Sequence, residues 1–117
     1  MEDRVFNKIL VPLDGSALAE YVLPHTVAMA RAFNAQVHLL QVLEQPSAVE
    51  AMPLVDPLTW RLKKTEADLY LGTIKSRLER SNLQVEKDLL EGHSTDQILK
   101  FAHDNGIDLM IFSSHGQ

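Results

Sequence analysis

The sequence predicts an α/β fold in which helices cover both faces of a parallel sheet. Short apolar runs alternate along its 117 residues with longer segments whose apolar residues recur every three or four positions. The short runs hold too few polar residues for either side of a strand to face water, which is typical of a parallel sheet. The order β-α-β-α-β-α-β therefore predicts a three-layer α/β/α sandwich with right-handed crossovers.

The first strand and the first helix are predicted near the N-terminus. Residues 8–13 form an apolar run that ends at the turn-forming sequence Asp14-Gly15-Ser16, as a buried strand does. From residue 17 to residue 33, apolar side chains recur on one helical face. Pro24 lies inside this segment and lacks a backbone N–H, so we expect a kink in the helix.

A long connection separates the second strand from the second helix. Residues 37–43 are rich in branched apolar side chains, which favours a strand. Residues 45–57 contain three prolines and show no consistent period, so we expect a loop, and its length suggests a functional or lid role. Helical periodicity returns from 58 to 81. Its apolar stripe consists of Ala67, Tyr70, Leu71, Ile74 and Leu78.

The remaining elements follow the same alternation. Residues 84–90 predict a third strand. Ser94 and Gln97 have the spacing of a capping box at a helix start, and Asn105-Gly106 supplies a left-handed stop for that helix. The apolar run 109–112 predicts a fourth strand. Four strands and three helices complete the predicted sandwich.

Composition excludes several classes of function. Acidic residues outnumber basic ones by 16 to 11 without any basic patch, which argues against a nucleic acid partner. The chain has no cysteine, so disulfides and thiolate metal sites are excluded. No apolar run approaches the ~20 residues of a membrane span, and the N-terminus lacks the apolar stretch of a signal peptide. We therefore expect a cytoplasmic protein with no membrane partner.

Two predicted strand ends carry residues suited to ligand binding, which occurs at the carboxyl ends of strands in such sheets. Asp14 directly precedes a helix, where its carboxylate could accept hydrogen bonds from a ribose or help to hold a cation beside phosphates. Simple capping of the helix by Asp14 and Ser16 is the alternative. Residues 113–116 offer hydroxyls, an imidazole and a flexible backbone, which are the materials of an anion-binding turn or of a plain loop.

Five segments, taken in order, resemble a universal stress protein domain. They are residues 8–16, the helix start 17–20, the strand 37–43, the turn 90–92 and the run 108–116. The resemblance spans nearly the whole chain, and it rests on the order and spacing of the segments together. It implies a sheet of order 3-2-1-4-5 with an ATP or AMP site at its carboxyl edge.

The resemblance also implies which residues form the nucleotide site. They are Pro12, Leu13, Asp14, Val42, Ser113 and Gly116. The first three would border adenine and ribose, and Val42 would hold the adenine through its backbone. The family motif is Gly-x-x-Gly, nine residues, and then Gly-Ser or Gly-Thr. Ser113 replaces its first glycine, Gly116 matches the second, and the rest of the motif is not in the sequence.

The resemblance carries expectations about domain organisation and partners. We expect residues 1–117 to be a single domain that lacks the fourth helix and the fifth strand of the family, the strand through which members often pair. A homodimer or a tandem arrangement of domains is therefore implied. The implied cofactor is ATP or AMP, with Mg²⁺ beside the phosphates, and the implied activity is at most weak ATP hydrolysis.

Three functions stay open from the sequence. The first is a stress-related regulatory module that binds adenine nucleotide, and the second is a nucleotide-independent interaction and dimerisation domain. The third is an adenylating enzyme of a related α/β fold. A dedicated enzyme is the weaker hypothesis, because Ser113 or Ser114 beside His115 does not by adjacency alone provide a nucleophile held against a base. We expect no metal site, because the histidines form no helical His-x-x-x-His pair.

Overall fold

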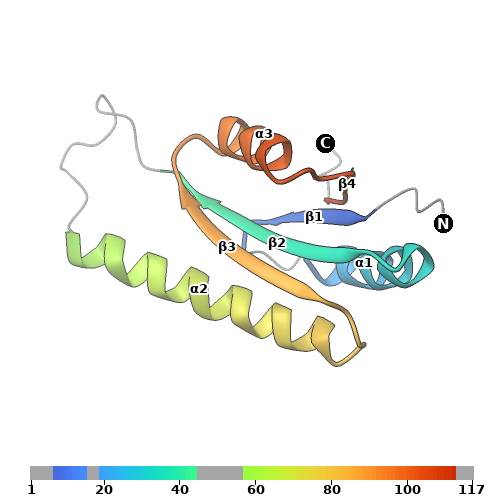
Figure 1. Ribbon diagram of the computed structural model, residues 1–117. Helices are drawn as coiled ribbons and strands as arrows, with labels where there is room; N and C mark the ends of the chain where they lie inside the picture. The colour runs from blue at the N-terminus through green and yellow to red at the C-terminus, as the bar shows by residue number, and fades with distance from the viewer. Residues whose placement is uncertain (1–6, 16–18, 45–56, 113–117) are drawn as a thin grey trace.

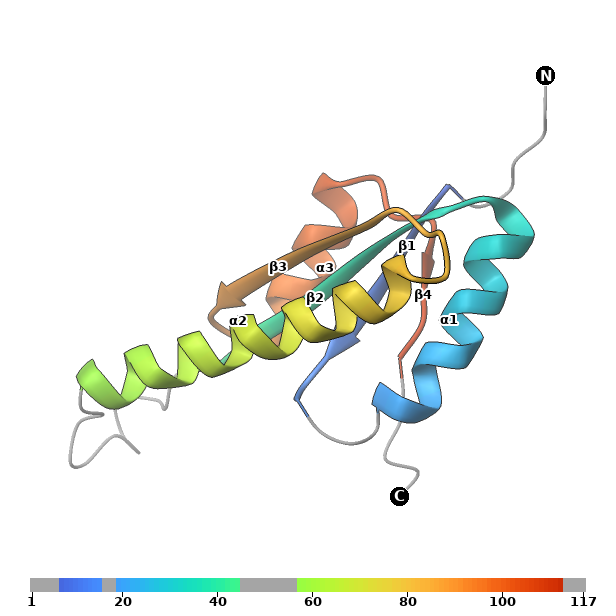
Figure 2. The same cartoon turned by 90° about the horizontal axis from the view of Figure 1, so that it is seen from below.

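The computed structural model describes residues 7–15, 19–44 and 57–112 of the chain. Its elements, in chain order, are β1 (Lys8–Leu13), α1 (Ala19–Phe33), β2 (Gln36–Leu43), α2 (Pro57–Glu79), β3 (Val85–Glu91), α3 (Ser94–Asp104) and β4 (Leu109–Met110). The strands form one parallel sheet of order β3-β2-β1-β4. Helices α1 and α2 cover one face, and α3 covers the other (Figures 1 and 2). The predicted sandwich and strand order are confirmed.

Most element boundaries lie within two residues of the predicted ones. Helix α2 begins at Pro57, one residue earlier than predicted, so Pro57 belongs to the helix and not to the preceding loop. Proline suits a first helical turn, because the N–H that it lacks would have no partner inside the helix. Strand β4 is shorter than predicted and contains only Leu109 and Met110, while Phe112 is largely exposed. The predicted loop at 45–56 lies outside the described residues.

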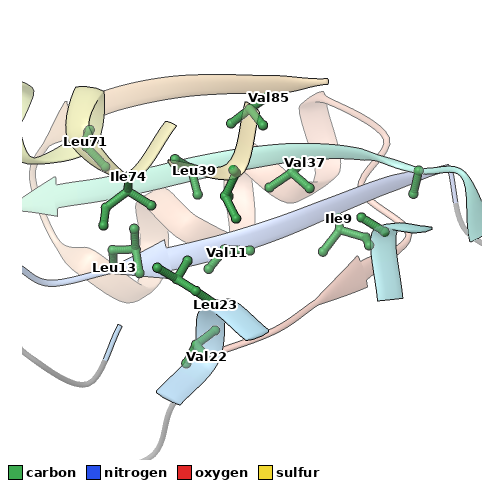
Figure 3. Packing of buried hydrophobic residues seen from close by; sticks show 13 residues of the cluster. Ile9, Val11, Leu13, Val22, Leu23, Val37, Leu39, Leu71, Ile74 and Val85 are labelled. Atoms are coloured by element: carbon green, nitrogen blue, oxygen red, sulfur yellow. The ribbon is translucent and has the colours of Figure 1, made fainter. Parts of the chain in front are cut away.

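The larger core lies between the sheet and the helices α1 and α2 (Figure 3). Side chains alternate between the two faces of a strand, so every second residue of β1 and β2 points into this layer. Its 13 buried residues are Ile9, Val11, Leu13, Val22, Leu23, Ala30, Ala35, Val37, Leu39, Leu71, Ile74, Leu78 and Val85. Burial of each large aliphatic side chain stabilises the fold by about 1.5–3 kcal/mol. This layer therefore fixes the sheet against which the opposite face is built.

The opposite face of the sheet holds the intervening residues. Leu10 and Leu40 are fully buried there, and the contact between His38 and Phe101 shows that this face meets α3. Helix α3 itself has no fully buried residue, and its apolar residues Ile98 and Phe101 are half-buried. The α3 layer is therefore thinner than the layer under α1 and α2.

Polar contacts hold both ends of α3 to the sheet. At its start, the backbone N–H of Ser94 donates to Glu44 Oε2 at 2.8 Å. The predicted capping box is wrong, because His93 is the N-cap, its side chain makes no capping hydrogen bond, and Ser94 is already the first helical residue. At its end, Lys8 Nζ donates to the carbonyl oxygen of Asn105 at 3.1 Å. Gly106, at φ +63°, then provides the left-handed stop.

Candidate nucleotide pocket

A cavity of about 370 Å³ lies at the carboxyl ends of β1 and β2. Pro12, Leu13 and Asp14 line it from the end of β1, and Leu40 and Val42 line it from β2. These residues meet because β1 and β2 are parallel neighbours, with Leu13 opposite Gln41 in the last residue pair. The cavity therefore occupies the edge of the sheet at which ligands bind in folds of this class.

Helix α3 supplies much of the remaining wall. Its first two residues, Ser94 and Thr95, bring hydroxyl groups to the pocket, and Ile98 and Leu99 follow one helical turn later. Leu99 lines the pocket while 60% of its surface is exposed. The start of α3 reaches the pocket because β3 ends beside β2, where the N–H of Gly92 donates to the carbonyl oxygen of Leu43 at 3.0 Å. The position of α3 thus determines the width of the pocket.

The last part of the lining comes from α1 and from β4, the strand that pairs with β1. Val22 of α1 borders the pocket, as do Met110 of β4 and Phe112 just beyond it. Strand β4 is placed here by its pairing with β1, in which Met110 lies opposite Leu10. Asp108 anchors this strand, because its Oδ2 accepts hydrogen bonds from the backbone N–H groups of Asn7 and Lys8 at 2.7 and 3.0 Å.

Four of the six predicted site residues line this one cavity. They are Pro12, Leu13, Asp14 and Val42. Ser113 and Gly116 lie outside the described residues, although Phe112, which directly precedes Ser113, borders the pocket.

The electrostatics of the pocket centre on Asp14. It is the only charged side chain in the lining that the structure describes, and the rest of the lining is mainly apolar. The negative charge of Asp14 also affects Tyr70 on α2. The pKa of the Tyr70 hydroxyl is raised mainly by burial, and the charges of Asp14 and Glu20 raise it further. A carboxylate beside an apolar wall can orient a ligand that carries hydroxyl groups or a bound cation.

The described ranges contain no group of three or more histidine, aspartate or glutamate side chains placed to bind a metal. His93 has an exposed side chain, and its Nδ1 lies 3.6 Å from Asp96 Oδ2. Within the same ranges, no helix has the length and apolar character needed to cross a membrane.

Sequence reasoning missed the contribution of α3 to the pocket. The spacing of Ser94 and Gln97 predicts only a helix start, whereas Ser94, Thr95, Ile98 and Leu99 all line the pocket. The available signal was their position directly after the carboxyl end of the third predicted strand, where the residues of a helix start can reach a ligand.

Comparison with known proteins identifies the family. The model of the universal stress protein family matches residues 6–117. The chain belongs to the universal stress protein family. This match confirms the resemblance drawn from the five segments of the sequence, and it connects the chain to a family of stress-related proteins.

Individual relatives share the fold of this universal stress protein domain. The universal stress protein MJ0531 of Methanocaldococcus jannaschii is 26% identical over 117 residues, which cover 98% of this chain and 68% of that protein. The solved structure of MJ0577 is 31% identical with a TM-score of 0.76, covering 97% of this chain and 78% of that one. A universal stress protein in complex with cAMP has a TM-score of 0.64 at 16% identity, covering 91% and 70% of the two chains.

Proposed function

We propose that this universal stress protein domain is a regulatory module that binds an adenine nucleotide, ATP or AMP, in the pocket at the carboxyl ends of β1 and β2. The observation that carries the proposal is the mainly apolar cavity with Asp14 as its single charged lining residue within the described ranges. Such a combination fits a ligand with a flat apolar part and a part rich in hydroxyl groups.

The apolar part of the pocket suits a nucleobase. Ile98 and Leu99 on α3 lie across from Pro12 and Val42 at the strand ends, and together they form walls for a planar ring. The backbone of Val42 can orient that ring. Leu43 turns its carbonyl oxygen towards β3, so the backbone of the adjacent Val42 faces β1. The N–H of Val42 belongs to the last residue pair between β1 and β2, Leu13–Gln41, and the carbonyl oxygen of Val42 points past that pair.

The polar part of the pocket suits a ribose. The Asp14 carboxylate can accept hydrogen bonds from ribose hydroxyls. Because this acceptor is charged, such hydrogen bonds are stronger than those between neutral groups. When ATP is bound with Mg²⁺, Asp14 is also the lining residue suited to coordinate that ion, since Mg²⁺ prefers one or two carboxylates together with phosphate oxygens. We propose that Ser113 and Gly116 approach the phosphates, because they follow Phe112 at the pocket border.

A relative supports the class of ligand. The universal stress protein solved in complex with cAMP holds an adenine nucleotide.

Titration calorimetry with ATP and AMP tests the proposal. We expect binding to the intact protein, and Asp14→Ala should weaken it by about 1–3 kcal/mol, because the ribose hydroxyls then lose their acceptor. Asp96→Asn is the matched control, since Asp96 is exposed on α3 and does not line the pocket. Absence of binding to any adenine nucleotide at millimolar concentration would reject the proposal.

A nucleotide-independent interaction domain is the second candidate. In the part of the chain that the structure describes, β4 pairs only with β1, and Phe112 beyond it is 57% exposed. An open strand edge beside an exposed apolar side chain can pair with a second copy of the chain. Light scattering in the absence of nucleotide tests this candidate, for which a homodimer is the expected result and a strict monomer the contrary one.

A further inference from the structure

His38 lies in the middle of β2, beneath α3. In the sheet it stands opposite Leu10 of β1 on one side and Glu86 of β3 on the other. Its ring meets the ring of Phe101 on α3 edge to face, with 5.3 Å between centroids and 75° between ring planes. The imidazole is therefore a direct packing contact between the sheet and this helix.

The environment of this ring favours its neutral form. His38 Nδ1 is buried and has no hydrogen-bond partner among the described residues. In a neutral imidazole this nitrogen can remain an acceptor, which costs little when it is left unpaired. Protonation would place an N–H donor and a positive charge on this half-buried ring, at a nitrogen that has no acceptor among the described residues, and burial disfavours that form.

Charged groups near His38 come from both neighbouring strands. Burial is the main effect and lowers the pKa of His38 below its ordinary value of 6.5; Asp88 and Glu86 on β3 raise it, and Lys8 on β1 lowers it. Helix α3 adds the uncharged Phe101 ring. The charged or titratable side chains of α3 are exposed: Asp96, Lys100, His103 and Asp104. Because the pKa is lowered, the packing of α3 against His38 is favoured above pH 6.5 and becomes less favourable as the pH falls below 6.5.

Helix α3 is the element that this penalty would move. It has no fully buried residue, whereas α2 on the other face has four. It also contributes Ser94, Thr95, Ile98 and Leu99 to the pocket. A shift of α3 away from His38 would therefore widen the pocket and separate its apolar walls.

We propose that His38 is a pH-sensitive latch: its protonation loosens α3 from the sheet and lowers the affinity of the pocket for its ligand. The effect on affinity rests on the nucleotide-binding function proposed above, whereas the loosening of α3 does not. The latch acts at a distance, because His38 is not part of the pocket lining.

The test measures adenosine binding between pH 8 and pH 5 by calorimetry. Adenosine is the probe because nucleotide phosphates titrate near pH 6 and would add their own pH dependence. We expect the dissociation constant of the wild-type protein to rise by about threefold to tenfold on acidification, since one pKa unit of coupling corresponds to a factor of ten. In His38→Phe the side chain cannot be protonated, so this coupling is lost and the dissociation constant should rise by less than about twofold.

Other histidines provide matched controls. His93→Gln removes the exposed imidazole of the α3 N-cap, and His103→Gln removes an exposed imidazole within α3. Each control should keep the wild-type pH dependence. An affinity that does not change with pH in the wild-type protein, or that changes equally in His38→Phe, would overturn the proposal.

Hydrogen exchange separates the latch from the binding function. Protection factors of the α3 amides should fall on acidification in the wild-type protein and stay constant in His38→Phe and His38→Gln. If adenosine fails to bind at every pH while α3 still loosens through His38, the nucleotide function is wrong and the latch stands. If the protection of the α3 amides does not change with pH in the wild-type protein, the latch is wrong. This measurement uses the wild-type protein alone, so it does not depend on whether a variant folds.

Discussion

Glu44 at the end of β2 holds the first residue of α3, because its Oε2 accepts a hydrogen bond from the backbone N–H of Ser94 at 2.8 Å. The carboxylate satisfies one of the free N–H groups of the helix start and faces the positive end of the helix dipole. It takes over the capping role that the His93 side chain does not perform. The contact joins the end of β2 to the start of α3, and both elements contribute residues to the pocket.

Removal of this carboxylate should destabilise the domain from the start of α3. Glu44→Ala should lower the free energy of unfolding by about 0.5–2 kcal/mol, the usual cost of losing a cap. Glu44→Gln is the matched variant, since an amide oxygen can keep the hydrogen bond while the charge is lost, and it should cost less. Urea unfolding measures both, and equal stability of Glu44→Ala and the wild-type protein would show that the contact contributes nothing.

The two sides of α2 should respond very differently to the same truncation. Leu71 is fully buried against the sheet, whereas Leu69 on the same helix is 66% exposed. Leu71→Ala should cost about 2–5 kcal/mol, because it leaves a cavity in the larger core. Leu69→Ala should change stability by no more than about 0.5 kcal/mol. Similar losses in the two variants, measured by thermal unfolding, would contradict the placement of α2.

Glu20 and Arg77 connect α1 to α2 through two hydrogen bonds of 2.8 and 3.0 Å. The hydrogen bond and the charge of Arg77 lower the pKa of the Glu20 carboxyl below its ordinary value of 4.5. The pair therefore stabilises the fold above pH 4.5, and this contribution is lost as the pH falls through the lowered pKa. Because the pair is exposed, salt should weaken the effect.

Arg77→Gln should return the pKa of Glu20 towards its ordinary value, and NMR titration of the Glu20 carboxyl measures the change. Lys75→Gln is the control on the same helix, because it removes the 3.3 Å ion pair with Glu79 and leaves Glu20 untouched. An unchanged Glu20 titration in Arg77→Gln would show that the pair does not persist in solution.

Most of the fold could be predicted because local pattern and burial agree. The runs 8–13 and 37–43 are apolar on both sides, and such strands have few alternatives to a central place in a parallel sheet. Gln41 departs from this pattern, since it is buried in β2 with its Oε1 unpaired among the described residues. The length of β4 could not be predicted, because pairing with β1, and not apolar composition, determines where a strand ends.

The candidate site divides in the same way. Asp14 and Val42 could be predicted because both stand at strand ends, which the sequence locates directly. The α3 wall is harder to predict: its place after the third strand is a signal, but the contact from Glu44 that holds Ser94 spans 50 positions of the chain. A spacing rule such as the capping box considers only neighbours in sequence and therefore assigned Ser94 the wrong role.

The exposed wall of the pocket offers a test of binding that leaves stability unchanged. Leu99 lines the pocket but is 60% exposed, so Leu99→Ala should barely affect unfolding. It should weaken AMP binding by about 1 kcal/mol, because the base loses apolar contact area against α3. Leu69→Ala removes a leucine of similar exposure that does not line the pocket, so AMP should bind this control as it binds the wild-type protein. Calorimetry that finds equal AMP affinities for the two variants would place the base away from α3, and the ligand orientation proposed for this pocket would then have to be reversed.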